Sequence, residues 1–155
     1  MVIVFIIISM HIGIEGGINQ PIIGFDYTLN NGTIVKAYIG KQDLNHNVHL
    51  NLTLTGSYYQ GKNTGYSFSK YGLGIMIRKI PWRIAPFGEM GIDYVSRELN
   101  KNKEWGVGFS YTIGFLVNFY YENINVYPAF YYDGVTDFKI NAGNLGIKLG
   151  IKYEL

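Results

Sequence analysis

The stretch Leu145-Gly-Ile-Lys-Leu-Gly-Ile-Lys-Tyr-Glu-Leu155 alternates strictly between two kinds of residue. Its odd-numbered positions are all apolar or aromatic, and its even-numbered positions are all Gly, Lys or Glu. Because successive side chains of a β-strand point to opposite faces of the sheet, this pattern predicts a strand with one wholly apolar face. Strands of soluble domains are typically about 5–6 residues long, whereas a tilted strand that crosses a bilayer needs about 9–11. The length therefore favours a membrane-spanning strand.

The composition of the 155-residue chain favours the same environment. Charged residues make up 15% of it and aromatic residues 16%, against roughly 25% charged residues in an ordinary soluble domain. The net charge of +2, without a basic block, argues against a nucleic-acid partner. The chain has no Cys, which excludes a disulfide scaffold. No apolar run reaches the roughly 18 residues of a membrane helix, so strands are expected to span the bilayer.

The alternation recurs along the chain and predicts one domain, residues 9–155, of eight antiparallel strands in hairpin order. The expected strands are 10–19, 33–41, 48–58, 70–78, 87–97, 105–119, 124–133 and 145–155. Pro21 is expected to end the first strand because proline cannot donate a ladder hydrogen bond. Residues 98–104 are expected to form a charged loop. The links at 20–32, 60–65, 97–104 and 134–144 are longer than those at 42–47, 80–83 and 121–123, as in barrels with short periplasmic turns and longer outer loops.

Residues 1–8 form a short continuous apolar run. We interpret this run as the remnant of an export signal peptide whose basic start is missing, since no Lys or Arg precedes it and no small-x-small cleavage site follows. The alternative is that these residues extend the first strand.

The two faces of the strands decide between a soluble barrel and a membrane barrel, which differ in which face is polar. The apolar face carries bulky residues such as Trp105, Phe109 and Phe115, which suit lipid better than a narrow interior. The opposite face holds Gly, Ser, Thr, Asn and nearly all the strand charges. The sequence therefore predicts an all-β fold, an eight-stranded antiparallel up-and-down transmembrane β-barrel.

The final strand resembles the carboxy-terminal assembly signal of bacterial outer-membrane barrels through Lys148, Gly150, Tyr153 and Leu155, although Leu155 stands where that family usually has Phe or Trp. The whole chain beyond residue 9 is similar to the small eight-stranded barrels of the OmpA transmembrane-domain and OmpX type. Its most family-like parts are the final strand, the Gly-rich sixth strand and the stretch from Pro86 to Gly91. The resemblance implies the outer membrane of a Gram-negative bacterium, contacts with membrane lipids and the outer-membrane assembly machinery, and a role in envelope integrity, adhesion or small-solute leakage.

Charged residues on the polar face are expected to form a lumenal charge network, because an unpaired buried charge costs several kcal/mol. The network comprises Glu15, Lys36, Lys70, Arg78, Glu89, Asp93, Arg97, Asp133, Lys148, Lys152 and Glu154. Neighbouring strands would pair Glu15 with Lys148 or Lys152, and Glu89 and Asp93 with Arg78. A gated polar pathway and a catalytic carboxylate pair are the alternatives to a plug.

Aromatic residues are expected at both membrane interfaces, where their amphipathic rings are favoured. Tyr58, Tyr94, Trp105 and Tyr132 are predicted near one rim, and Trp82, Phe119, Tyr121 and Tyr153 near the rim that holds the termini.

No residue set in the sequence points to catalysis, a metal or a cofactor. His46 and His49 are close in sequence, but a metal needs more ligands in better geometry. The function we expect is a non-enzymatic, monomeric outer-membrane barrel with a side-chain-filled lumen and a structural or surface-interaction role toward an unknown extracellular ligand. A narrow channel for water, ions or small solutes is the alternative, and a lipid-modifying barrel enzyme is third.

Overall fold

The computed structural model describes residues 9–24, 28–43, 47–63, 65–79, 82–136 and 141–155. The run interpreted as a signal remnant, residues 1–8, lies outside the described residues, as does His46. The described residues contain no helix that is long and apolar enough to cross a membrane.

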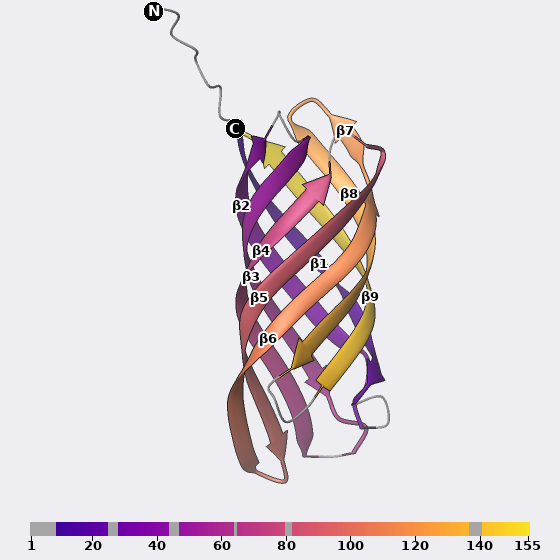
Figure 1. Ribbon diagram of the computed structural model, residues 1–155. Coiled ribbons are helices and arrows are strands. Elements are labelled where there is room, and N and C mark those ends of the chain that lie inside the picture. Colours follow the sequence, from indigo (N-terminus) through magenta and orange to yellow (C-terminus); the bar gives the residue numbers. More distant parts are fainter. Residues whose placement is uncertain (1–8, 25–27, 44–46, 64, 80–81, 137–140) are drawn as a thin grey trace, which may run out of the picture.

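The described part of the chain is almost entirely antiparallel sheet (Figure 1). Its strands are β1 (Met10–Ile23), β2 (Gly32–Asp43), β3 (Val48–Gln60), β4 (Tyr66–Lys79), β5 (Ile84–Leu99), β6 (Asn102–Val117), β7 (Phe119–Tyr121), β8 (Ile124–Thr136) and β9 (Asn141–Glu154). β6 and β7 are two parts of one broken strand, because both pair with β8 on either side of Asn118. The barrel therefore has eight strands when β6 and β7 are counted as one.

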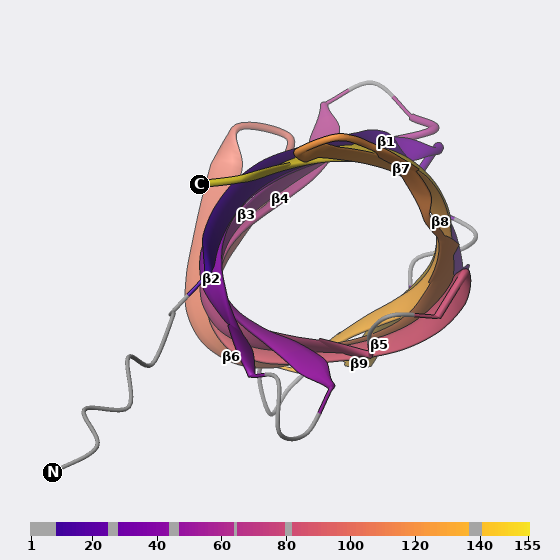
Figure 2. The same ribbon diagram turned by 90° about the horizontal axis from the view of Figure 1, so that it is seen from above.

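The sheet closes on itself, as the view along its axis shows (Figure 2). Strands β1 to β6 pair in sequence order, β8 pairs with both β7 and β9, β1 pairs with β9, and the β6–β8 pairing completes the ring. Both described termini lie at one end of the barrel, which we call the terminal end, and the opposite end is the loop end (Figure 1). The expected up-and-down topology is confirmed.

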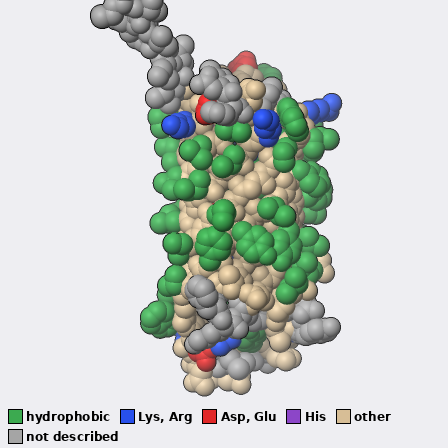
Figure 3. Space-filling model, in the orientation of Figure 1, with side chains coloured by type: hydrophobic (Ala, Val, Ile, Leu, Met, Phe, Trp, Pro, Cys, Tyr) green, Lys and Arg blue, Asp and Glu red, His purple; other side chains and the backbone are tan. Residues whose placement is uncertain are grey.

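The apolar face of the strands points outward. Ile14 on β1, Leu54 on β3 and Ile92 on β5 each expose about 60% of their surface (63%, 58% and 63%). The exposed charged side chains of the described residues lie in turns or near strand ends: Lys41, Lys62, Arg83, Glu98, Lys101, Lys103, Glu104 and Glu122. The face seen in Figure 3 shows this separation, with hydrophobic side chains along the wall and charges at the two ends. This is the membrane barrel, not the soluble one.

Pro21 does not end the first strand, contrary to the sequence prediction. β1 pairs with β2 only as far as Asn19, and beyond that point it pairs with β9 alone. Proline is tolerated on a strand where one edge needs no donor. The register shifts between Pro21 and Ile23, so the strand continues through an irregularity.

The expected charged loop at 98–104 is also wrong. β5 and β6 extend through it and are joined by the two-residue turn Asn100-Lys101. Both turn residues have positive φ, 50° and 71°, which matches the twist of the flanking strands in a tight hairpin. This β5–β6 hairpin reaches furthest beyond the barrel at the loop end (Figure 1).

Asn118 marks the break between β6 and β7 and ties it to the neighbouring turn. Its side-chain amide donates to the Trp82 carbonyl at 2.8 Å, and its backbone N–H donates to the Arg83 carbonyl at 2.8 Å. The Asn125 amide donates to the Asn118 side-chain oxygen at 2.6 Å. The broken strand therefore keeps its polar groups satisfied at the terminal end.

Two substitutions on the broken strand β6–β7 can test whether the middle of the outer face is surrounded by hydrocarbon. Phe115→Arg should lower the free energy of unfolding by roughly 2–4 kcal/mol, because Phe115 lies on the outer wall well inside the barrel's length, whereas Tyr121→Arg at the terminal rim should cost about 0–1 kcal/mol. Urea titrations of protein folded into lipid vesicles would measure both. Equal penalties would contradict a hydrocarbon environment around Phe115.

Candidate functional site

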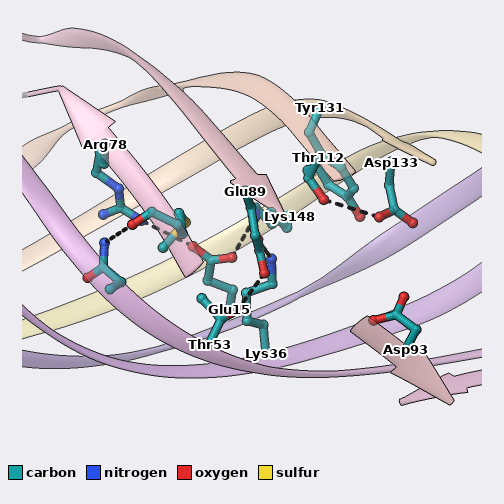
Figure 4. Close-up of polar contacts among 12 residues, drawn as sticks. Glu15, Lys36, Thr53, Arg78, Glu89, Asp93, Thr112, Tyr131, Asp133 and Lys148 are labelled. Carbon is teal, nitrogen blue, oxygen red and sulfur yellow. Dashed lines mark hydrogen bonds and ion pairs between the residues drawn. The ribbon is translucent and has the colours of Figure 1, made fainter. Parts of the chain in front are cut away.

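The lumen holds two groups of paired charges. The central network consists of Glu15, Lys36, Arg78, Glu89 and Lys148, and the outer network, nearer the loop end, consists of Lys70, Asp93 and Asp133. Each of these side chains is at most 8% exposed. They come from strands on all sides of the barrel, so the closed sheet is what brings them together. Figure 4 shows Glu15, Lys36, Glu89 and Lys148 of the central network pointing toward one another inside the barrel.

Glu15 is the centre of the central network. Its Oε2 lies 2.5 Å from Lys148 Nζ on the neighbouring strand β9, and its Oε1 lies 3.2 Å from Arg78 Nη2 on β4. The Tyr127 hydroxyl donates a third contact to Oε1 at 2.7 Å. One carboxylate thus links two cations from opposite parts of the wall.

Lys36 on β2 and Glu89 on β5 form the second ion pair of the central network. The hydroxyl of Thr53 on β3, one of the two strands between them, donates to Glu89 Oε1 at 2.6 Å. This pair spans the lumen, because β2 and β5 are three strands apart in the sheet.

The outer network joins one cation to two carboxylates. Lys70 Nζ lies 2.6 Å from Asp133 Oδ2 and 3.5 Å from Asp93 Oδ2. The Thr112 hydroxyl donates to Asp133 Oδ1 at 3.1 Å. The outer network therefore carries one formal negative charge, which balances the one formal positive charge of the central network.

Aromatic rings hold the cations that ion pairs do not fully satisfy. The Arg78 guanidinium lies 4.2 Å from the ring centroid of Tyr127 and 5.5 Å from that of Tyr38. Its Nε and Nη1 have no hydrogen-bond acceptor among the described residues, and the ring faces supply favourable electrostatics instead. Lys148 Nζ lies 4.6 Å from the Phe87 centroid.

Two glycines of β9 make room for lumenal tyrosines of β8. Gly150 lies opposite Tyr127 and Gly146 lies opposite Tyr131. A Cβ on either glycine would collide with the ring of its partner. The small residues of the final strand are therefore required by the rings that complete the interior, a relation that alternation alone did not reveal.

An apolar cluster of buried residues lies toward the loop end of the lumen. It consists of Leu29, Tyr59, Phe68, Val95, Val135 and Ala142, with Tyr66 packed against it. Between the two networks lies a cavity of about 10 Å³, bounded by residues that include Lys36, Lys70 and Asp93. Such a volume holds about one water molecule.

The predicted pairing is right for one partner and wrong for another. Glu15 does pair with Lys148, but Glu89 and Asp93 pair with Lys36 and Lys70 instead of Arg78. Partners were expected on neighbouring strands, as is true of Lys70 on β4 and Asp93 on β5, whereas Lys36 on β2 reaches Glu89 on β5 across the lumen.

Three of the predicted network residues lie near the ends of the barrel. Arg97 is partly exposed on the β5–β6 hairpin, where its Nε donates to Glu104 at 2.7 Å. Lys152 is buried and pairs with the partly exposed Glu154 at 2.6 Å. These pairs are separate from the central and outer networks.

The described histidines lie in the lumen near the terminal end. His11 Nε2 is 2.6 Å from Asn51 Oδ1, and the rings of His11 and His49 are 4.4 Å apart. No group of three or more His, Cys, Asp or Glu residues in the described ranges is arranged to hold a metal ion. Both side chains are buried, with 1% of His11 and 3% of His49 exposed.

The predicted interface aromatics lie toward the two ends of their strands. Tyr58, Tyr94, Trp105 and Tyr132 occupy the loop-end parts of β3, β5, β6 and β8, and Trp82, Phe119, Tyr121 and Tyr153 lie near the terminal end. All are exposed except Tyr132, which is half-buried beside Tyr111. Of the predicted assembly-signal residues, Lys148 and Gly150 face the lumen, and Tyr153 and Leu155 are exposed. Their roles stay predictions.

A closed eight-stranded barrel with an apolar wall and a charged, filled interior is the architecture of the small outer-membrane β-barrels. Among solved structures, the fold is similar to that of Neisserial surface protein A (NspA), with a TM-score of 0.63 and 10% identity over 94% of this chain and 97% of that one. It is also similar to the N-terminal β-barrel domain of Pseudomonas aeruginosa OprF, with a TM-score of 0.58 and 13% identity over 92% of this chain and 97% of that one. No protein-family model and no curated protein sequence matches the chain. The likeness is one of fold, and it confirms the predicted fold type.

Coupling across the lumen can be measured with Lys36 and Glu89. Lys36→Met or Glu89→Gln alone should destabilise the barrel by about 3–5 kcal/mol, because each leaves one buried charge without its partner. The double variant should cost less than the sum of the two. Urea unfolding in lipid vesicles gives the four free energies of the cycle.

Glu98→Gln is the matched control, since Glu98 is an exposed carboxylate on the same strand as Glu89. Its effect should stay within about 0.5 kcal/mol. Additive effects of the Lys36 and Glu89 substitutions would show that the two residues do not stabilise each other.

Proposed function

We propose that this protein is a monomeric, non-enzymatic barrel of the bacterial outer membrane whose lumen is sealed by side chains and whose role is structural or surface-interacting. The observation that carries the proposal is the pairing of Lys36 with Glu89, Arg78 with Glu15 and Lys70 with Asp133 across the barrel. These contacts occupy the cross-section at successive levels. An eight-stranded barrel is only wide enough for side chains to fill it.

Charge balance supports a stable seal. The central network has three cations and two carboxylates, and the outer network has one cation and two carboxylates, so the eight groups sum to zero formal charge. A sealed, neutral interior avoids the cost of isolated charges in a region of low dielectric constant. The apolar cluster of Leu29, Tyr59 and Phe68 adds a second barrier at the loop end.

The proposed orientation places the terminal end in the periplasm. The connections there, between β2 and β3, β4 and β5, and β7 and β8, span four, four and two residues, whereas at the loop end the β1–β2 and β3–β4 connections span eight and five and the β8–β9 and β5–β6 connections span four and two. The two longest connections and the hairpin that projects furthest therefore lie at the loop end. Short periplasmic turns and longer outer loops are typical of such barrels. In this orientation the β5–β6 hairpin projects outside the cell, membrane lipids cover the apolar wall, and the final strand is the segment offered to the assembly machinery.

A narrow channel is the second candidate, because the small cavity between the two networks has a polar lining that includes Lys36, Lys70 and Asp93. Conduction would require both networks to part and the apolar cluster to move. A lipid-modifying enzyme has less support, since the described histidines, His11 and His49, lie in the lumen toward the terminal end.

Planar-bilayer recordings test the seal. The unmodified protein should show no steady ohmic conductance, and Glu89→Gln should lower the free energy of unfolding without producing an ion-selective current. Protein-free bilayers and Glu98→Gln are the controls. Steady conductance of the unmodified protein, with selectivity altered but stability unchanged in Glu89→Gln, would favour the channel instead.

A further inference from the structure

A second concave site lies at the loop end, outside the sealed lumen. It encloses about 600 Å³, within the range of roughly 300–1,000 Å³ found for small-molecule sites. Its lining comes mainly from the β3–β4 connection and the β5–β6 hairpin: Asn63, Tyr66, Arg97, Asn100, Asn102 and Glu104. We call this site the mouth pocket.

The mouth pocket is held in shape by backbone hydrogen bonds between connections. The Asn100 N–H donates to the Gly65 carbonyl at 2.8 Å, which fastens the tip of the hairpin to the β3–β4 connection. The Lys62 N–H donates to the Thr28 carbonyl at 2.9 Å, which fastens that connection to the end of the β1–β2 link. A site fixed before binding loses less conformational entropy when a ligand arrives.

The floor of the mouth pocket is equally fixed. Tyr66 packs against the apolar cluster toward the loop end of the lumen, and its carbonyl accepts a hydrogen bond from the Gly61 N–H at 2.7 Å. A tyrosine ring offers an apolar surface beside a polar hydroxyl. The pocket therefore combines one amphipathic aromatic residue with a rigid polar rim.

The polar groups of the rim both donate and accept hydrogen bonds, and they carry no net charge. The three asparagine amides each have an acceptor oxygen and a donor nitrogen. Arg97 and Glu104 neutralise each other through a hydrogen bond of 2.7 Å. Arg97 would repel a cationic ligand and Glu104 would repel an anionic one, so a neutral ligand rich in hydroxyl groups fits best.

We infer that the mouth pocket binds a neutral glycan at the cell surface. This inference rests on the proposed function, because it names the ligand class for the proposed surface-interaction role. Sugar hydroxyl groups match the amide rim, and one sugar face matches the tyrosine ring. The same chemistry is available from free or host-borne oligosaccharides and from the core sugars of lipopolysaccharide in the surrounding membrane.

The test uses the full chain in phosphatidylcholine nanodiscs, free of detergents with sugar headgroups. One arm screens an array of neutral, sialylated and sulfated oligosaccharides, followed by calorimetric titration with the best neutral ligand. The other arm titrates the lipopolysaccharide core oligosaccharide released from its lipid by mild acid. Binding in the first arm alone indicates free or host-borne glycans, and binding in the second indicates core sugars.

Two variants remove amides from the mouth pocket with little effect on the fold. Asn102→Ala deletes one amide on β6, and Asn100→Gly deletes another while keeping the positive φ of the turn. Each should weaken neutral-glycan binding about tenfold, the effect expected when a hydrogen bond worth about 1.4 kcal/mol is lost. Lys103→Ala is the matched control, because Lys103 is exposed between the lining residues Asn102 and Glu104 on the opposite face of the hairpin and should leave affinity unchanged.

Two results would overturn the inference: no binding in either arm, or binding of sulfated and sialylated glycans only, weakened by Lys103→Ala and not by Asn102→Ala. Heat-modifiable migration on gels confirms that each variant is folded. Bilayer recordings on the same samples separate the two proposals. A non-conducting barrel without glycan binding refutes the glycan and leaves the seal intact, whereas a conducting barrel refutes the seal.

Discussion

Hydrocarbon offers no partner to a backbone N–H or carbonyl group, so a strand in a membrane needs a neighbour along both edges. The pairing of β6 with β8 and of β1 with β9 meets this constraint by closing the sheet. Every other feature of the lumen depends on that closure, because it turns one face of each strand toward the others. The irregularities lie near the ends of the barrel, where a strand does not need a partner on both edges. Pro21 lies beyond the last residue of β1 that pairs with β2, and Asn118 separates β6 from β7 at the terminal end.

Closure also decides how the buried charges are satisfied. In an open sheet, a charged side chain meets only residues on adjacent strands, and those pairs are weak in water. In the closed barrel, Lys36, Arg78 and Lys70 reach carboxylates on strands that are not their neighbours. The resulting networks are neutral only when taken together. The charge balance of the lumen therefore depends on the order of the strands around the barrel.

Much of the fold was predictable from a period of two residues. The alternation of apolar and polar residues located the eight strands and assigned Glu15, Lys70 and Phe115 to the correct faces, because successive side chains of a strand point to opposite faces. It failed at Glu98 to Glu104, where the β5–β6 hairpin extends beyond the rest of the barrel and both faces carry polar residues. It also could not identify the partner of Glu89, since contacts across a lumen depend on strand tilt and stagger. The mouth pocket was beyond its reach for the same reason, being assembled from connections that meet only in three dimensions.

The lumenal contacts join residues that are remote along the chain. Tyr127 and Glu15 are separated by 112 positions, as are Tyr131 and Asn19, and Lys36 and Glu89 by 53. Contacts of such large sequence separation form slowly, because the chain must lose the entropy of closing a long loop before any of them stabilises the fold. None of the contacts of Glu15 with β8 and β9 can exist until the last third of the polypeptide has arrived. A partly inserted chain would leave the charges of Glu15 and its partners unpaired. Insertion into the bilayer should therefore be a single cooperative event, in which the lumenal contacts form as the first and last strands pair.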